Sequence, residues 1–200
     1  MTGYDPETLR FYQEEAPVYT ASGTGGAARH LPDFLTRLNK GAKILELGCG
    51  GGIDAAYMIA QGFEVTPTDG TPAIATLAEK RIGQTVSVMR FDQLDAVEEF
   101  DAVVASASLL HAPRTELPSI LRLIWDSLKP GGWHIATYKG GGVEGRDGFG
   151  RYFNYLNRIQ LLDYYLAAAK WTDIDIVEGM GGGYDGKQGP WLRIVARKPV

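Results

Sequence analysis

The chain contains only one cysteine, Cys49, and no long apolar run. A single cysteine cannot form an intrachain disulfide, and such sparse use is typical of proteins in reducing compartments. No apolar stretch approaches the ~20 residues that a membrane-spanning helix needs, and the first residues, Met1 to Glu7, have neither the charged nor the apolar region of a secretory signal. These absences predict a cytoplasmic protein without a membrane partner.

Basic residues are in the minority. The chain has 20 Lys and Arg against 24 Asp and Glu, which gives a formal net charge of -4 and a pI near 5.4. It therefore offers no broad basic face to a polyanion, which disfavours nucleic acid as a partner and favours small molecules. Because 200 residues with 44% hydrophobic content can bury one substantial core, we expect a single domain, residues 1–200, as a monomer or homodimer.

The sequence does contain a glycine turn between a strand and a helix. Ile44 to Leu47 is a short apolar run typical of a strand, and glycines at positions 48, 50, 51 and 52 precede a helical pattern that begins near Asp54. Glycine lets the backbone come close to a bound molecule, and the free N–H groups at the start of the helix favour its anionic end. The turn predicts a ligand site without identifying the ligand.

The spacing of these glycines departs from the dinucleotide-binding fingerprint. That fingerprint needs a third glycine three positions after the second, where this chain has Ile53. The motif present is Glu-x-Gly-x-Gly-x-Gly, from Glu46 to Gly52, and an acidic residue, Asp69, ends the next apolar run. In these features the sequence resembles the class I S-adenosylmethionine-dependent methyltransferases.

Strands and helices alternate along most of the chain. Strands are expected at residues 44–47, 63–68, 86–90, 101–105 and 133–138. Helices are expected at residues 5–16, 29–38, 55–60, 73–81 and 113–128. Pro67 cannot donate to a ladder, so the pairing of its strand either stops nearby or bulges. The alternation predicts a mostly parallel sheet with helices on both faces.

The pattern changes after residue 138. A glycine-rich, charged stretch at 140–150 and a helix at 157–169 precede two strands, 174–177 and 191–196, which a loop at 179–189 joins. With no helix between them, these strands most simply form an antiparallel hairpin. The expected fold is a Rossmann-like α/β fold with a seven-stranded, mostly parallel sheet, helices on both faces and a C-terminal antiparallel β-hairpin, as the methyltransferase resemblance also implies.

The resemblance implies S-adenosylmethionine as cosubstrate and assigns residues to its parts. Glu46 approaches the amino group, while Gly48 and Gly50 admit close contact with the amino acid end. Asp69 accepts hydrogen bonds from the ribose hydroxyls, and an acid after the third strand lies near the adenine amino group. The remaining cofactor contacts are expected from Cys49, Gly70, Asp92, Gln93 and Ser106.

Some of these residues have a structural alternative. Asp92 can cap the turn before Val97 instead of approaching adenine. Cys49 can be a small turn residue, because a nucleophilic role needs a neighbouring base that the sequence does not show. No residue is assigned as a metal ligand.

His111 is the candidate base. Methyl transfer is an in-line displacement on an activated donor, so the protein mainly holds the acceptor aligned and free of water. An acceptor that arrives protonated needs a base, and His111 follows the fourth strand; it can equally satisfy backbone groups at a helix start. The chain lacks the Asn/Asp-Pro-Pro-aromatic sequence that the resemblance associates with nucleobase amines and glutamine amides, which weighs against those substrates.

A second resemblance covers the glycine-rich stretch. Gly-Val-Glu-Gly-Arg-Asp at 142–147 and Gly-Arg-Tyr-Phe-Asn-Tyr at 150–155 are similar to small bacterial methyltransferases loosely grouped with the tellurite-resistance type. Arg146 and Arg151 can bind an anionic acceptor by paired hydrogen bonds, or they can solvate the loop and pair with nearby carboxylates.

The first 28 residues are unusually aromatic. They are expected to form either an amphipathic helix docked on the core or a lid over the pocket, with Tyr12 and Tyr19 beside the acceptor. The stretch Gly23 to Gly26 is the flexible link that such a lid needs.

The sequence therefore predicts an S-adenosylmethionine-dependent methyltransferase for a small-molecule acceptor. The alternative is a module that binds S-adenosylmethionine or its demethylated product without transferring a methyl group. A nicotinamide oxidoreductase is disfavoured by Ile53 and by the terminal hairpin.

Overall fold

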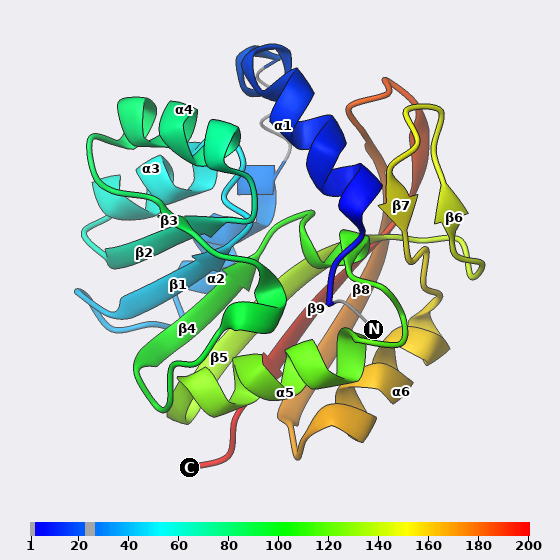
Figure 1. The fold of residues 1–200 in the computed structure, drawn as a ribbon. Helices are drawn as coiled ribbons and strands as arrows, with labels where there is room; N and C mark the ends of the chain where they lie inside the picture. The colour runs from blue at the N-terminus through cyan, green and yellow to red at the C-terminus, as the bar shows by residue number, and fades with distance from the viewer. Residues whose placement is uncertain (1–2, 23–26) are drawn as a thin grey trace.

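The computed structural model describes residues 3–22 and 27–200, which fold around a seven-stranded sheet (Figure 1). The strand order is β3-β2-β1-β4-β5-β9-β8. The parallel strands are β1 (Lys43–Leu47), β2 (Glu64–Asp69), β3 (Ser87–Val88), β4 (Phe100–Ala105) and β5 (Leu128–Lys139). Strand β9 (Gln188–Arg197) runs antiparallel to both β5 and β8 (Thr172–Gly182). The predicted fold is confirmed.

Helices connect the strands and cover both faces of the sheet. They are α1 (Pro6–Ala21), α2 (Leu31–Leu35), α3 (Ile53–Ala60), α4 (Pro72–Ile82), α5 (Leu117–Ser127) and α6 (Arg158–Ala168). Single 3-10 turns are η1 (Ala27–His30), η2 (Phe91–Gln93) and η3 (Leu109–His111). A separate two-stranded ribbon, β6 (Gly145–Arg146) and β7 (Tyr152–Phe153), follows β5.

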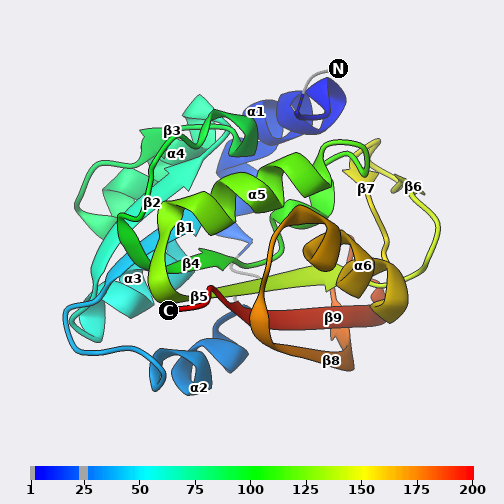
Figure 2. The ribbon, with the colours of Figure 1, turned by 90° about the horizontal axis from the view of Figure 1, so that it is seen from below.

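The core consists of two apolar layers that the sheet separates. Along β4, Val103 and Ala105 pack in the layer that holds α5 and α6, whereas Ala102 and Val104 pack in the layer of α2 and α3. Figure 2 shows α5 and α6 on one face of the sheet and α2 on the other. All four side chains are 0% exposed. This two-sided burial explains why β4 reads as a continuous apolar run rather than an alternating one.

Helix α1 extends beyond its predicted end. Asp5 caps its start as expected, accepting a hydrogen bond of 2.8 Å from the backbone N–H of Thr8. The helix nevertheless continues through Pro17 to Ala21 instead of stopping at Ala16. Its packing against α4 supports the last turns, so tertiary contact outweighs the missing proline donor.

Two other boundaries were predicted wrongly. Helix α5 begins at Leu117, not at residue 113, because Pro118 suits the first turn of a helix and residues 113–116 form a turn. The loop predicted at 179–189 is largely strand, with Gly181 opposite Gly189 in the β8–β9 ladder. The glycines of this segment marked a turn where the neighbouring strand holds the chain extended.

Of the two alternatives at Pro67, the structure shows the end of pairing and not the bulge. Strand β2 pairs with β1 without a bulge at Pro67, and its pairing with β3 includes only Thr68 and Asp69, so this ladder stops beside the proline.

Helix α1 crosses above the carboxyl ends of the parallel strands (Figure 1). It packs on α4 and reaches the β6–β7 ribbon, so it lies over the end of the sheet at which β1 and β2 stop. The predicted link Gly23 to Gly26 lies outside the described residues. Within residues 3–22 and 27–200, no helix combines the length and apolarity that crossing a bilayer requires.

The turn after β1 requires glycine on steric grounds. Gly48 has φ +71°, and a Cβ there would lie 2.5 Å from the Cβ of Ser108. Gly41 has nearly the same conformation, φ +72°, but a Cβ there would meet nothing within 4 Å. The two positions separate the cost of the left-handed backbone from the cost of a clash.

We therefore expect Gly48→Ala and Gly41→Ala to destabilise the fold by different amounts. Both lose about 1–2 kcal/mol through the left-handed conformation, and Gly48→Ala loses a further ~1–3 kcal/mol by overpacking against Ser108. Urea unfolding of both variants measures the difference. Equal losses at the two positions would contradict the close approach of the turn to Ser108.

A polar network lies buried under α6. The His134 imidazole is 0% exposed, and its Nδ1 donates to the carbonyl of Val103 at 2.9 Å. That donor fixes Nε2 as the acceptor for the hydroxyl of Tyr165, also at 2.9 Å. Burial lowers the pKa of His134 to about 4, so the ring stays neutral in the folded chain at neutral pH.

This network predicts a loss of stability in mild acid. The folded-state pKa is below the ordinary histidine value, so the contribution of His134 is complete above pH 6.5 and decreases as the pH falls toward 4. Between pH 7 and pH 5 the free energy of unfolding should fall by about 2 kcal/mol from this residue. In His134→Gln, whose amide can both donate and accept, that part of the decrease should be missing from urea titrations at the two pH values.

Candidate functional site

A small cavity lies beneath α1, at the carboxyl ends of β1, β2 and β4. Ligands of open α/β sheets bind at this end. The cavity measures about 80 Å³. It is lined by Tyr4, Thr8, Leu9, Tyr12, Tyr19, Gly48, Gly50, Asp69, Gly70, Thr71, Ile74, Arg90, Phe91, Ala107, Ser108 and His111. The structure thus brings together seven residues that the sequence analysis assigned to a site: Tyr12, Tyr19, Gly48, Gly50, Asp69, Gly70 and His111.

Asp69 is held in place by the backbone. Its side chain is buried, and its oxygens accept hydrogen bonds from the N–H of Gly50 at 3.1 Å and of Thr71 at 2.9 Å. Burial raises its pKa to about 6, although both hydrogen bonds favour the ionised form. The Thr71 side chain also hydrogen-bonds to this carboxylate. A carboxylate has about four acceptor positions, so Asp69 can accept a further hydrogen bond from a ligand in the cavity.

Two further acids are buried beside the glycine turn. Glu46, near the end of β1, is 2% exposed, and Asp54, in the first turn of α3, is 5% exposed. Oε2 of Glu46 has no hydrogen-bond partner among the described residues. The hydroxyl of Ser106 interacts with the carboxylate of Asp54 and partly offsets the effect of burial on the pKa of that acid. Burial raises the pKa of both acids, and the charges of Asp54 and Asp69 raise that of Glu46 further. The sequence analysis used Asp54 only to mark the start of a helix.

Cys49 occupies the middle of the turn as a small buried residue. Burial raises the pKa of its thiol, and the charges of Glu46 and Asp69 add to the effect. The thiol packs in a small apolar cluster with Ala75 and Ala78 of α4. This environment suits a structural residue and opposes formation of the thiolate that a nucleophile needs.

The residues after β3 that line the cavity are not the ones that were predicted. Asp92 forms an ion pair with Arg90, Nε to Oδ1 at 3.1 Å, and Gln93 accepts from the backbone N–H of Arg90 at 3.0 Å. Neither Asp92 nor Gln93 lines the cavity, whereas Arg90 and Phe91 do. The sequence analysis looked for an acid here and missed that the two preceding side chains face the cavity.

His111 and Tyr12 form a hydrogen-bonded pair in the cavity wall. Nδ1 of His111 lies 2.6 Å from the carbonyl oxygen of Tyr152, and Nε2 lies 2.9 Å from the hydroxyl of Tyr12. Because a carbonyl only accepts, Nδ1 carries the proton and Nε2 accepts. Burial lowers the pKa of His111 to about 3, so the imidazole is neutral.

Arg151 continues this chain of hydrogen bonds. Its Nη1 donates to the hydroxyl of Tyr12 at 3.0 Å, and its Nε and Nη2 donate to Oδ2 of Asp147 at 2.9 and 2.6 Å. The guanidinium is almost fully buried, and its Cζ lies 5.0–5.7 Å from the ring centroids of five aromatic residues. These are Phe11, Tyr12, Phe149, Phe153 and Tyr184.

Arg146 lies away from the cavity. Its guanidinium binds Asp5 through two hydrogen bonds of 3.0 and 2.7 Å and also lies 3.1 Å from a carboxylate oxygen of Glu7. Both acids belong to the first turn of α1 or its cap. Of the two arginines assigned to the acceptor, the structure thus places Arg151 beside the cavity wall and Arg146 on the outside of α1.

Helix α1 is fastened at both ends. Near its start, Asp5 binds Arg146, and the hydroxyl of Thr8 accepts from the backbone N–H of Tyr152 at 2.8 Å. Near its end, Arg81 of α4 donates to the carbonyls of Thr20 and Gly51, at 3.1 and 2.6 Å. The aromatic residues of its middle therefore face the glycine turn and the β6–β7 ribbon.

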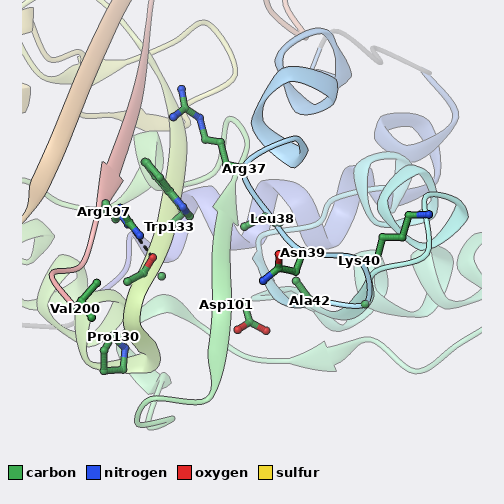
Figure 3. A pocket seen from close by; sticks show the side chains of 13 residues that line it. Arg37, Leu38, Asn39, Lys40, Ala42, Asp101, Pro130, Trp133, Arg197 and Val200 are labelled. Atoms are coloured by element: carbon green, nitrogen blue, oxygen red, sulfur yellow. Dashed lines mark hydrogen bonds between the residues drawn. The ribbon is translucent and has the colours of Figure 1, made fainter.

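A larger cleft lies at the opposite end of the sheet (Figure 3). It measures about 480 Å³, and Trp133 lies in it between the guanidinium groups of Arg37 and Arg197, 4.9 and 5.1 Å from the ring centroid. It is formed at the amino ends of β1 and β4, beside Ala42 and Asp101. Because α/β sheets bind ligands at their carboxyl ends, we assign the site to the smaller cavity.

Within residues 3–22 and 27–200, no group of three or more His, Cys, Asp or Glu side chains is arranged to hold a metal ion.

Comparison with known proteins identifies the glycine-turn half of the chain. Residues 44–132 match a family model described as a methyltransferase domain. A curated ubiquinone biosynthesis O-methyltransferase of Chromobacterium violaceum is 36% identical over a match that covers 50% of this chain and 47% of that protein. The chain thus spans less than half the length of the curated relatives it matches.

Solved structures extend the likeness to the whole fold. A Burkholderia thailandensis 1,6-didemethyltoxoflavin-N1-methyltransferase, with bound 1,6-didemethyltoxoflavin and S-adenosylhomocysteine, has TM-score 0.73, 21% identity, and coverage of 97% of this chain and 90% of that one. Phosphoethanolamine N-methyltransferase 2 of Haemonchus contortus, in complex with S-adenosyl-L-methionine, has TM-score 0.78, 16% identity, and coverage of 99% and 61%.

At these low identities the solved structures establish only the fold. The family model adds a similarity in sequence, which is limited to residues 44–132. The resemblance to the tellurite-resistance type stays a prediction. Residues 44–132 are thus similar in sequence to a methyltransferase domain, and the chain as a whole shares the fold of solved S-adenosylmethionine-dependent methyltransferases.

Proposed function

We propose that this protein binds S-adenosylmethionine in the cavity under α1 and transfers its methyl group to a small-molecule acceptor. The observation that carries the proposal is the set of buried carboxylates around the glycine turn, Glu46, Asp54 and Asp69. None of the three forms an ion pair with another described residue. Buried acids without a partner are costly, and S-adenosylmethionine brings two positive groups, an ammonium and a sulfonium.

The residues present fit the parts of this cosubstrate. The unpartnered oxygen of Glu46 can accept a hydrogen bond from its ammonium group. Asp69 can accept a further hydrogen bond from a ribose hydroxyl. Gly48 and Gly50 line the cavity, so the backbone of the glycine turn can come close to the ligand.

The comparisons support a small molecule as the acceptor. The relatives in sequence are named for O-methylation in ubiquinone biosynthesis, and one structural neighbour was solved with the small heterocycle 1,6-didemethyltoxoflavin. The names of both relatives refer to small compounds and not to macromolecules. The acidic balance of the chain, net charge -4, also disfavours nucleic acid.

S-adenosylmethionine supplies a methyl group already activated by its positive sulfur. The work left to this chain is to align the acceptor and exclude water. Where the acceptor carries a proton, His111 can take it, because the ring is neutral and its Nε2 already accepts a hydrogen bond in the cavity. The aromatic side chains of α1 keep solvent out of the same space.

We also propose that the N-terminal segment, residues 1–28 of the single domain, acts as a lid. The cavity of about 80 Å³ is far smaller than ligand pockets, which measure ~300–1,000 Å³. Leu9, Tyr12 and Tyr19 of α1 occupy the space next to the glycine turn. Ligand entry therefore needs an outward movement of α1, which the contacts at its two ends oppose.

Asp69→Ala tests the ribose contact. The variant should bind S-adenosylmethionine more weakly by ~1.5–3 kcal/mol, the range for hydrogen bonds to a charged group. Calorimetry measures the affinity, with Asp126→Ala as control, since Asp126 pairs only with exposed Arg122 on α5. In the unchanged chain, affinity should also fall as the pH drops through about 6, where Asp69 gains a proton. Unaltered affinity in Asp69→Ala would remove this residue from the site.

Arg146→Gln tests the lid. Its ion pair with Asp5 is partly exposed and is worth about 0.2–1 kcal/mol, so its loss should raise the open fraction of α1 by about 1.4- to 5-fold. The association rate of S-adenosylmethionine in stopped-flow fluorescence should rise by the same factor. Arg122→Gln, which removes an exposed pair on α5, should leave the rate unchanged. An Arg146→Gln rate at or below that of the unchanged chain would show that the pair does not restrain entry.

Two measurements test the proposed function as a whole. Calorimetry should show binding of S-adenosylmethionine and S-adenosylhomocysteine but not of NAD. Incubation with S-adenosylmethionine and a panel of small acceptors should then release S-adenosylhomocysteine. Binding without turnover of any acceptor would favour a sensor module over an enzyme.

A further inference from the structure

The hydroxyl of Tyr12 forms hydrogen bonds with two side chains that could each bind another hydroxyl in its place. It lies 2.9 Å from Nε2 of His111 and 3.0 Å from Nη1 of Arg151. Both partners are fixed independently of Tyr12. His111 is held by the carbonyl of Tyr152, and Arg151 is held by Asp147.

The directions of these two hydrogen bonds follow from the partners. Nδ1 of His111 must donate to the Tyr152 carbonyl, so Nε2 can only accept, and Tyr12 is its donor. Arg151 can only donate, so Tyr12 accepts from it. The pair of His111 and Arg151 therefore selects one chemical group, an oxygen that gives one hydrogen bond and receives another.

We propose, on the basis of the proposed function, that the methyl acceptor is a phenol or enol, and that its hydroxyl binds between His111 and Arg151 in the place that Tyr12 now holds. Tyr12 is then an internal occupant of the acceptor site. Because it is carried by α1, the same outward movement that admits the cosubstrate removes its hydroxyl and frees both partners.

Other acceptor classes match the two partners less well. A carboxylate or phosphate oxygen only accepts, so it would face the lone pair of His111 without a proton to share. An ammonium group only donates, so it would face the N–H of Arg151 and its positive charge. A hydroxyl satisfies both partners and leaves no buried donor or acceptor unpaired.

The surroundings favour a flat ring on that hydroxyl. The ring of Tyr12 packs edge-on against Tyr19 and Phe11, with centroids 4.9 and 5.2 Å away. His111 and Phe153 form the neighbouring wall, with centroids 4.5 Å apart. Phe11 and Tyr19 belong to α1 and move with Tyr12, whereas His111 and Phe153 stay in place. Imidazole and aromatic surfaces therefore remain beside the vacated space, and aromatic pairs gain from such offset and edge contacts.

The proposed step balances in atoms and charge. The acceptor oxygen attacks the methyl carbon of S-adenosylmethionine, the new C–O bond forms, and the S–CH₃ bond breaks with its electron pair staying on sulfur. The hydroxyl proton passes to Nε2 of His111, and the imidazolium later releases it to water. Arg151 donates to the oxygen as negative charge develops on it, which is the placement that lowers such a barrier.

Matched small probes test the hydrogen-bonding rule without turnover. The chain loaded with S-adenosylhomocysteine is titrated by calorimetry at pH 7 with 4-methylphenol, 4-methylanisole, 4-methylbenzoate and 4-methylaniline. The phenol should bind at least tenfold more tightly than the other three, because it alone presents an oxygen that donates and accepts. Equal or tighter binding of the anisole, the benzoate or the aniline would overturn the proposal.

Variants test the place of Tyr12. Tyr12→Phe keeps the ring but removes the competing hydroxyl, so the phenol should bind about 3- to 10-fold more tightly. His111→Phe should weaken phenol binding at least tenfold. Tyr164→Phe, on the far face of the molecule in α6, should change neither. Weaker phenol binding by Tyr12→Phe would show that Tyr12 assists the acceptor instead of standing in for it, and would overturn the proposal.

Two outcomes of these measurements distinguish this proposal from the proposed function. S-adenosylmethionine binding with turnover of acceptors other than phenols or enols would overturn the acceptor class alone. Absence of S-adenosylmethionine binding would overturn the proposed function itself.

Discussion

Burial of acid around a glycine turn is the constraint on which this structure depends. Glu46, Asp54 and Asp69 lie at the junction of three elements, β1, α3 and β2, and none has a basic partner among the described residues. An ionised carboxylate in such a place is costly, and burial raises the pKa of each. The ammonium and sulfonium groups of the proposed cosubstrate would supply the positive charge that these groups lack.

The position of the turn explains why the acids are tolerated there. It follows β1, which is buried and paired on both sides, by β2 and by β4. The two apolar layers on either face of the sheet supply the stability of the domain, so the edge at the carboxyl ends of the strands can hold unpaired polar groups. Unsatisfied groups of this kind concentrate at functional sites in folded proteins.

The positions of the residues around the glycine turn were predictable because they are close in sequence to a strand end. Glu46, Gly48 and Asp69 each sit at or just after the carboxyl end of a parallel strand, and the strand pattern alone brings such positions to one edge. The same reasoning failed after β3, where Asp92 turns to Arg90 and does not line the cavity. Side-chain direction in a 3-10 turn is set by local hydrogen bonds, which the apolar pattern does not reveal.

The contacts of Tyr12 with His111 and Arg151 join distant parts of the chain, so no local sequence pattern predicts them. Tyr12 meets His111 across 99 positions and Arg151 across 139. The sequence analysis singled out all three residues but joined them to no network, and it assigned Arg146 to the ligand although that side chain holds α1. Two arginines five positions apart in a glycine-rich stretch look alike in sequence. The short β6–β7 ribbon turns one toward the cavity and the other toward the outer side of α1.

Arg81 of α4 links the glycine turn to helix α1. Its guanidinium bridges the carbonyl of Gly51, in the turn, and that of Thr20, at the far end of α1. The glycine turn and the helix above it are thus joined through one planar guanidinium group. Under the proposed function, a displacement of the Gly51 carbonyl by S-adenosylmethionine is transmitted directly to the end of α1.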